Sequence, residues 1–229
     1  MTSLSIIMPV LNEAPGIGAA LAALTCYRER GVEVIVADGG SSDGTLELAR
    51  PLADKAITAA RGRGAQMNAG AAAAKGDVLL FLHADTKLPP DADRLVLEGL
   101  AACGRNWGRF DVHIAGGPAL RLVTATINLR SRITGIATGD QAMFVTRAAF
   151  EAAGGFPDIA LMEDVALSAR LKRSGPSLCL RARAVTSARR WEKHGVLRTV
   201  LLMWRLRLAY FFGAAPAKLA ARYGYATRH

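Results

Sequence analysis

Short apolar runs alternate with helical patterns along the first 86 residues. Strands are predicted at residues 5–10, 32–37, 56–60 and 78–82. Between them, apolar positions recur at helical spacing over residues 17–30 and 65–75. Strands joined through helices form right-handed crossovers, which indicates a mostly parallel sheet with helices on its faces. The run at 78–82 is apolar throughout, as is typical of a strand buried on both sides.

The pattern continues after residue 86 with more helices. Helices are predicted at residues 91–102, 118–132, 148–153 and 163–174, and strands at 108–114, 142–145 and 178–182. The strand at 108–114 alternates, which predicts one face in water. Residues 196–212 predict an amphipathic helix that is too charged to span a bilayer. It either lies in a membrane interface or packs on the sheet with its arginines reaching solvent.

Composition narrows the class of protein. The chain has 229 residues, 51% hydrophobic and 21% charged, which is ordinary for a globular α/β protein. No signal peptide or transmembrane helix is expected, and the three widely spaced cysteines are expected to be reduced, buried thiols of a cytoplasmic protein. The net charge of +10 is concentrated after residue 180, where eleven Lys or Arg face one acid, Glu192. Such a tail suits anionic lipid or a phosphorylated substrate; nucleic acid is not expected, because no aromatic-basic surface is visible.

Polar residues follow the predicted strands at the sheet edge where ligands bind in open α/β folds. Asp85, after strand 78–82, is either a ligand for a hard divalent cation or a turn cap before Pro89. Asp38, after strand 32–37, either accepts a hydrogen bond from a base or ribose or caps its own turn. The cationic glycine loop at residues 61–64 suits phosphate at a helix N-terminus, although such loops are common.

An acid pair, Glu163 and Asp164, opens the helix predicted at 163–174. Acids in a first turn complement the helix dipole, which is the structural explanation. The functional explanation is a general base, because a neighbouring like charge raises the pKa of a carboxyl group.

Taken in order, these motifs resemble the inverting family-2 glycosyltransferases with a GT-A fold. The resemblance covers residue 5 to about residue 191. It is carried by Ile7-Met8-Pro9-Val10-Leu11-Asn12-Glu13, Asp38-Gly39-Gly40-Ser41-Ser42-Asp43-Gly44-Thr45, Asn68-Ala69-Gly70, His83-Ala84-Asp85 and Glu163-Asp164. The stretch Leu82-His83-Ala84-Asp85-Thr86, together with Gly139-Asp140-Gln141, is similar to a small bacterial subgroup.

The resemblance implies an organisation and a set of roles. Residues 1–195 would form a single Rossmann-like GT-A domain, with a nucleotide-binding half at about 1–86 and an acceptor half at about 87–195; a basic amphipathic helix and tail would follow at 196–229. The donor nucleotide would contact Pro9, Asn12, Glu13, Asp38, Asn68 and Arg63. Asp85 and His83 would hold Mn²⁺ or Mg²⁺, and Asp164 would be the general base. Gly139, Asp140, Gln141, Glu163, Arg190 and Trp191 would lie on the acceptor and diphosphate side.

The expected activity is hexosyl transfer from a nucleotide-diphosphate sugar. Departure of a diphosphate calls for a Lewis acid and cationic contacts, and one base without a protein nucleophile implies direct displacement with inversion. The acceptor is unknown; the apolar, basic terminal helix suggests a lipid-linked one presented at the inner face of the cell membrane. Two alternatives remain at this stage: a sugar-phosphate nucleotidyltransferase, and a non-catalytic module that binds nucleotide or membrane.

The sequence departs from the family pattern at three positions. His83 replaces the first acid of Asp-x-Asp, and imidazole suits softer metals than Mg²⁺. Gly39 replaces the usual second Asp of its turn. Ser187 stands at the first position of the Gln/Arg-x-x-Arg-Trp element, which argues against a polymerising synthase.

Overall fold

The computed structural model describes residues 2–224 and contains one eight-stranded sheet. The strands are β1 (Leu4–Val10), β2 (Glu33–Asp38), β3 (Lys55–Thr58), β4 (Val78–Phe81), β5 (Thr86–Lys87), β6 (Trp107–Ile114), β7 (Phe144–Thr146) and β8 (Leu178–Thr186). Their order is β3-β2-β1-β4-β7-β6-β8-β5. The first four are mutually parallel, β7 is antiparallel to both of its neighbours, and β6 pairs in parallel with β8.

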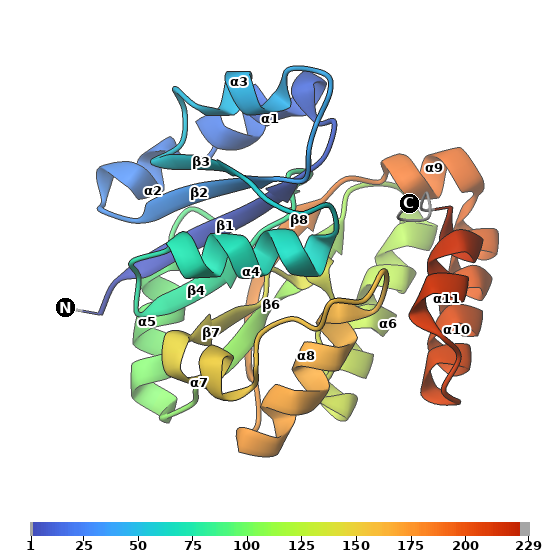
Figure 1. Ribbon diagram of the computed structural model, residues 1–229. Helices are drawn as coiled ribbons and strands as arrows, with labels where there is room; N and C mark the ends of the chain where they lie inside the picture. The colour runs from blue at the N-terminus through green and yellow to red at the C-terminus, as the bar shows by residue number, and fades with distance from the viewer. Residues whose placement is uncertain (1, 225–229) are drawn as a thin grey trace.

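Helices cover both faces of this sheet (Figure 1). They are α1 (Ala14–Ala22), α2 (Thr25–Glu29), α3 (Thr45–Ala49), α4 (Arg63–Ala73), α5 (Ala92–Cys103), α6 (Pro118–Thr134), α7 (Arg147–Ala152), α8 (Glu163–Leu171), α9 (Arg189–His194), α10 (Val196–Phe211) and α11 (Pro216–Tyr223), with short 3₁₀ turns η1 (Gly139–Gln141) and η2 (Lys172–Ser174). Side chains alternate along β1, so Ile6 and Met8 pack with α1, α2 and α5, whereas Ile7 packs with α4, α7 and α8. The predicted α/β fold with a mostly parallel, helix-covered sheet is confirmed.

Several boundaries differ from the predictions. The helix expected at 17–30 breaks after Ala22, and the turn at residues 23 and 24 brings both Leu24 and Tyr27 into the core, each 2% exposed. Strand β6 has no fully solvated face: only Asp111 and His113 along it are even partly exposed. Strand β5 and helices α9 and α11 were not predicted. The three cysteines are free thiols but are not buried; two are exposed and one is half-buried.

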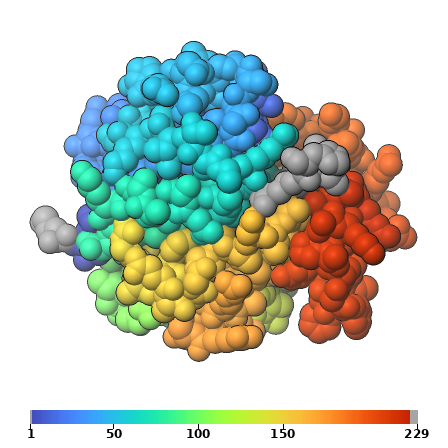
Figure 2. Space-filling model, in the orientation of Figure 1, coloured from blue at the N-terminus to red at the C-terminus, as the bar shows by residue number. Residues whose placement is uncertain are grey.

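The C-terminal helices form a hairpin at one side of the molecule (Figures 1 and 2). Leu206 of α10 and Leu219 of α11 pack against Leu161 and Met162, which precede α8. The predicted terminal helix is therefore present, but its inner face packs on the protein. No helix in residues 2–224 is long and apolar enough to cross a membrane.

Candidate active site

A cavity of about 920 Å³ opens beside the carboxyl ends of β1 and β4. This position follows from the topology, since these are the two central parallel strands of the sheet. The cavity collects eight of the residues predicted for the site: Pro9, Glu13, Arg63, His83, Asp85, Asp140, Arg190 and Trp191. Five separate segments of the chain, each carrying a residue predicted for the site, therefore meet at this cavity.

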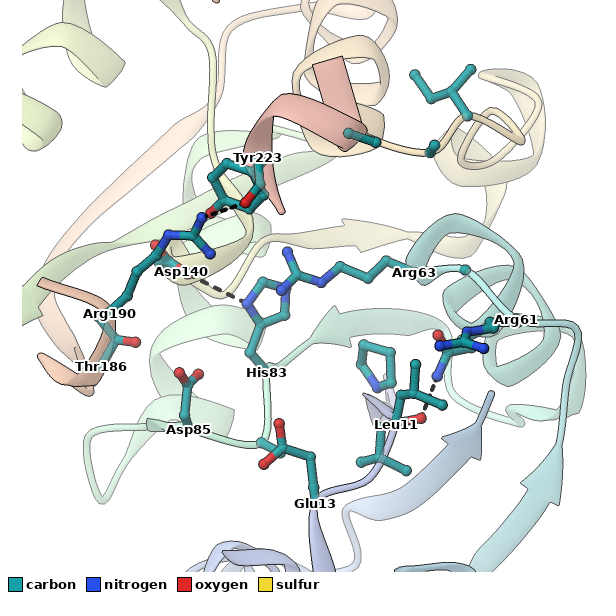
Figure 3. A pocket seen from close by; sticks show the side chains of 18 of the residues that line it. Leu11, Glu13, Arg61, Arg63, His83, Asp85, Asp140, Thr186, Arg190 and Tyr223 are labelled. Atoms are coloured by element: carbon teal, nitrogen blue, oxygen red, sulfur yellow. Dashed lines mark hydrogen bonds and ion pairs between the residues drawn. The ribbon is translucent and has the colours of Figure 1, made fainter. Parts of the chain in front are cut away.

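Cations and acids face each other across this cavity (Figure 3). The basic groups that line it are Arg61, Arg63, Arg189, Arg190, Lys193 and His194, and the acids are Glu13, Asp85, Asp140 and Asp158. Burial raises the pKa of Glu13, Arg189 lowers it and the negative charge of Asp85 raises it further, so that the net shift is upward. Two carboxylates close enough to repel each other attract a cation, and the surrounding arginines suit an anionic ligand.

Asp85 is the best-placed metal ligand in the cavity. No three His, Cys, Asp or Glu side chains in residues 2–224 lie close enough to hold a metal ion by themselves. Asp85 is exposed, and its carboxylate accepts a long hydrogen bond from Thr86 Oγ1 at 3.4 Å. A single carboxylate with diphosphate oxygens is a donor set that Mg²⁺ and Mn²⁺ accept. The residues present thus fit a hard cation that arrives together with a diphosphate.

His83 is less available for a metal than Asp85. Its Nδ1 lies 3.4 Å from Asp140 Oδ1. Its Cε1–Nε2 edge packs on Gly139, where an added Cβ would lie 2.5 Å from Nε2. Desolvation acts to raise the pKa of Asp140, but the hydrogen bond and charge of His83, with Arg63 and Arg207, lower it overall. Asp140 thus carries a negative charge that orients the imidazole; metal ligation by His83 stays a prediction.

Three predicted donor residues are engaged in local structure and do not line the cavity. Asp38 Oδ2 accepts hydrogen bonds from the backbone N–H groups of Gly40 and Ser41, both at 2.9 Å. Asn12 Oδ1 accepts from Ser42 N at 2.9 Å. Asn68 forms a reciprocal pair of bonds with the backbone of Phe156, at 2.8 and 2.9 Å. These side chains shape the loops around the cavity, and their direct contact with a nucleotide stays a prediction.

Gly39 has a packing reason for being glycine. A Cβ there would lie 2.9 Å from Cδ of Gln66, whose amide fills the space. Gln66 Nε2 donates to Val10 O at 2.6 Å and to Ala37 O at 2.9 Å, joining the ends of β1 and β2. The glutamine of α4 therefore occupies the volume where a side chain at residue 39 would lie.

The acid pair lies next to the main cavity, beneath η1. Glu163 and Asp164 line a small adjoining pocket together with His83 and Gly139. Asp164 Oδ2 accepts from Gly139 N at 2.8 Å, and Oδ1 accepts from Val165 N at 2.7 Å. Burial and the charge of Asp164 raise the pKa of Glu163 to about 7. The carboxylate of Asp164 is thus oriented by two backbone donors, while Glu163 takes a proton near neutral pH.

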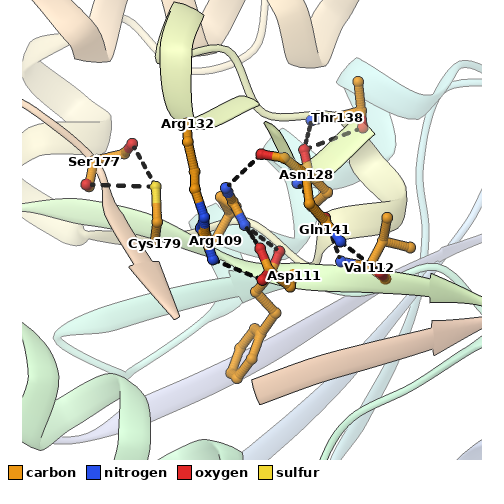
Figure 4. Close-up of polar contacts among 10 residues, drawn as sticks. Arg109, Asp111, Val112, Asn128, Arg132, Thr138, Gln141, Ser177 and Cys179 are labelled. Atoms are coloured by element: carbon orange, nitrogen blue, oxygen red, sulfur yellow. Dashed lines mark hydrogen bonds and ion pairs between the residues drawn. The ribbon is translucent and has the colours of Figure 1, made fainter. Parts of the chain in front are cut away.

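A polar network fixes η1, the turn that carries Asp140 (Figure 4). Gln141 is fully buried, and its side chain accepts from Thr138 N at 3.2 Å and donates to Asn128 Oδ1 at 3.5 Å. Asn128 in turn bonds both backbone groups of Val112 at 2.9 Å. Gln141 therefore holds the η1 turn in place from the protein interior and does not line the cavity.

Backbone strain occurs at three loops near the cavity and the acid pair. Asn12, Ala142 and Met162 are the non-glycine residues with positive φ in the described chain, at 53°, 44° and 73°. Asn12 directly precedes Glu13, Ala142 directly follows η1, and Met162 directly precedes the acid pair. Non-glycine residues in this region cost about 1–3 kcal/mol and cluster at functional sites.

The sequence did not reveal the contribution of α11. Tyr223 lines the cavity, and the guanidinium of Arg190 stacks 3.5 Å from its ring centroid and donates to its carbonyl at 2.9 Å. Nothing in the residues around Tyr223 indicated this role. Arg61 belongs to the predicted cationic loop at residues 61–64, and Arg189 adjoins the predicted Arg190, so its charge could have identified it.

Comparison with known proteins assigns the family. Residues 5–150, well over half of the chain, match the profile described as Glycosyl transferase family 2. A probable glycosyltransferase, YdaM of Bacillus subtilis, is 28% identical over 93% of this chain and 55% of its own length. The undecaprenyl-phosphate 4-deoxy-4-formamido-L-arabinose transferase of Aeromonas hydrophila is 34% identical over 38% of this chain and 30% of its own length. The chain thus spans about half or less of these curated relatives.

Solved structures show the same fold. The mannosyltransferase PcManGT of Pyrobaculum calidifontis, in complex with GDP-Man and Mn²⁺, has a TM-score of 0.66 at 23% identity over 91% of this chain and 61% of its own. TarS 1–349 of S. aureus, in complex with UDP-GlcNAc, has a TM-score of 0.64 at 17% identity over 81% of this chain and 58% of its own. The chain belongs to glycosyl transferase family 2 and has the GT-A fold.

Proposed function

We propose that this chain is an inverting transferase that moves a sugar from a nucleotide-diphosphate donor to a hydroxyl or carboxyl of a lipid-like acceptor. The observation that carries the proposal is the cavity, where several arginines surround Asp85 beside the carboxyl ends of β1 and β4. Structural neighbours with UDP-GlcNAc or GDP-Man bound support a nucleotide-sugar donor. The similarity to a small bacterial subgroup rests on the His83-Ala84-Asp85 and Gly139-Asp140-Gln141 motifs.

The donor diphosphate would lie between the cationic loop at Arg61 and Arg63 and the start of α9 at Arg189 and Arg190. Guanidinium groups bind phosphate oxygens in pairs and stabilise the negative charge that develops on a departing diphosphate. Asp85 would hold a divalent cation together with the diphosphate. A bound Mn²⁺, as in one structural neighbour, supplies Lewis-acid stabilisation of the leaving group.

Asp164 is the proposed general base. In the displacement, the acceptor oxygen forms a bond to the anomeric carbon while the bond from that carbon to the diphosphate breaks. The acceptor proton passes to the carboxylate of Asp164, and the diphosphate leaves with the bonding electrons. Asp164 lies 2.8 Å from N of Gly139, which directly precedes Asp140 of the cavity wall. Catalytic contacts in ligand-free structures are commonly longer than in the working complex.

Thermal shift with nucleotide diphosphates tests the donor assignment. UDP and GDP would each be added at about a hundredfold excess over their dissociation constants, with and without Mn²⁺, which stabilises a binding protein by about 2.7 kcal/mol. We expect one of them to stabilise the wild type in the presence of Mn²⁺ and Asp85→Ala to lose this effect. Asp91→Ala, at an exposed acid that caps α5, is the matched control and should behave as the wild type. Absence of any shift in the wild type would contradict the proposal.

The outer face of α10 supports a lipid-like acceptor at the inner face of a membrane. Five apolar side chains follow one stripe of this helix at helical spacing: Leu197, Leu201, Trp204, Leu208 and Phe211. All are exposed, Phe211 to 81% and Trp204 to 70%. Arg198 and Arg205 adjoin the stripe and are exposed as well. Apolar and basic side chains in this arrangement suit the interface of an anionic bilayer.

Flotation with anionic liposomes at low salt tests membrane contact. Leu201→Glu should abolish co-flotation, because it places a charge in the middle of the stripe. Leu48→Glu is a closely matched control, since Leu48 on α3 is 50% exposed and Leu201 is 52% exposed. Equal flotation of both variants, or none by the wild type, would refute membrane docking by α10 while leaving the donor assignment untouched.

A further inference from the structure

The seam between α6 and α10 changes from apolar to basic along its length. Ile127 of α6 and Val200 of α10 pack in the same apolar cluster under the first half of α10. Arg130 follows Ile127 by three residues and Arg207 follows Val200 by seven, so both continue the inward faces of their helices. Two arginines thus occupy positions on the α6–α10 seam where apolar residues would be expected.

Arg130 is held without adequate partners. Its Nε and Nη2 atoms are buried and have no hydrogen-bond partner among residues 2–224. Burial and repulsion from Arg207, with a smaller repulsion from Arg109, lower the pKa of Arg130 to about 10 against the attraction of Asp164. Buried donors in folded proteins are nearly always bonded, and an uncompensated buried charge is strongly unfavourable.

Arg207 lies one turn after Met203, a residue of the cavity wall. Burial lowers the pKa of Arg207, and the acids that act on it in the opposite direction are Asp164, Asp140 and Tyr223. Asp140 and Tyr223 both line the cavity, as does Met203, one turn earlier on α10. Arg207 is therefore close enough to Arg130, to Asp140 and to Asp164 for their charges to act on it, one turn of helix beyond a residue of the cavity wall.

The nearby acids are committed to other partners. Asp164 accepts from two backbone N–H groups, at 2.8 and 2.7 Å. Asp140 pairs with His83. Asp111, the remaining acid of this region, pairs with Arg109 and with Arg132. None of the ion pairs formed within residues 2–224 includes Arg130 or Arg207, so the seam carries a local excess of positive charge.

We propose that Arg207 and Arg130 bind an anionic group of the acceptor, a phosphate or a carboxylate, and thereby hold its attacking oxygen beside Asp164. This inference rests on the proposed function and adds the class of acceptor. Guanidinium groups bind such anions through paired, charge-assisted hydrogen bonds, which would satisfy the donors of Arg130. The same chemistry is offered by the headgroup of a phosphorylated lipid and by a soluble phosphate ester.

Thermal shift in the presence of saturating nucleoside diphosphate and Mn²⁺ isolates this site, because the donor arginines are then occupied. The probes are glycerol 3-phosphate, farnesyl phosphate below its critical micelle concentration, and neutral farnesol. We expect a further rise in melting temperature with a phosphorylated probe in the wild type. Arg207→Gln and Arg130→Gln should weaken its binding by at least about tenfold, as expected for a hydrogen bond to a charged group.

Arg121→Gln is the matched control, because Arg121 lies on α6, the same helix as Arg130, but is exposed. It should retain the full response to the phosphorylated probe. If Arg130→Gln does not fold, Arg207→Lys serves instead, since it keeps the charge but loses the paired geometry and should still weaken binding.

The outcomes separate the sources and the hypotheses. A response to farnesyl phosphate alone supports the site with a lipid headgroup as ligand, and a response to both phosphates supports it with a soluble ester. Equal responses to farnesol and farnesyl phosphate, or unchanged binding in Arg207→Gln, would overturn the anion site while the nucleotide shift still upheld the transferase. Absence of the nucleotide shift itself would overturn the proposed function, and this inference with it.

Discussion

Neutralising Glu163 should change how the stability of the protein depends on pH. Its side chain is 5% exposed, and its pKa rises from an ordinary value of 4.5 to about 7 through burial and the adjacent charge of Asp164. Because the folded state binds the proton more tightly than the unfolded state, stability from this group falls as the pH rises from about 4.5 to 7. A tenfold change in proton affinity corresponds to about 1.4 kcal/mol, so ionised Glu163 destabilises the folded protein by about 3 kcal/mol. Glu163→Gln removes this penalty.

Urea unfolding at pH 5 and pH 8 measures the effect. The gain in unfolding free energy of Glu163→Gln over the wild type should be larger at pH 8 than at pH 5 by about 2–3 kcal/mol. Comparing the two pH values cancels any effect of the substitution that does not depend on pH. Glu151→Gln, at an exposed position of α7, should show the same difference from the wild type at both pH values. A change below about 0.5 kcal/mol between the two pH values for Glu163→Gln would refute the raised pKa.

Two glycines give further predictions. Gly70→Ala places a Cβ 2.4 Å from Cγ2 of Ile7 in the core and should lower the unfolding free energy by about 1–3 kcal/mol in urea, whereas Gly18→Ala, with nothing within 4 Å, should be neutral or stabilising. Gly139→Ala places a Cβ 2.3 Å from Cε1 of His83, so the ring must shift. We expect the imidazole NMR signals of His83 to move and sugar transfer to fall. An unchanged spectrum would contradict this prediction and show that the backbone of η1 shifts while the ring stays in place.

The sheet was predictable from the sequence because buried parallel strands are continuous apolar runs. Strand β4 follows directly from that pattern. The inward residues of α1, Ile17 and Leu21, were predictable from their helical spacing. The break between α1 and α2 was not predictable, because it depends on tertiary packing that draws Leu24 and Tyr27 into the core. Likewise, β5 has only two residues, so its pairing with β8 leaves no periodic pattern in the sequence.

The site was predictable where a motif places a side chain at a strand end. Glu13 and Asp85 reach the cavity for that reason. Asp38 also follows a strand end within a motif, yet its carboxylate points back to its own loop. There it accepts hydrogen bonds from the backbone N–H groups of Gly40 and Ser41, which follow it by two and three residues in the chain. The sequence also could not show that Arg130 lacks partners, since that depends on which helix lies beside α6.

The cavity wall is assembled from the part of the chain that matches the family profile and from the part that follows it. The family match ends at residue 150, yet more than half of the lining residues come after that point, from Asp158 to Tyr223. Under the proposed function the donor contacts β1, β4 and the start of α9, so substitutions in α10 and α11 would alter the acceptor side and leave the donor contacts in place. Under that proposal, exchanging residues 196–224 between two such transferases would create hybrids whose acceptor preference follows one parent and whose donor preference follows the other.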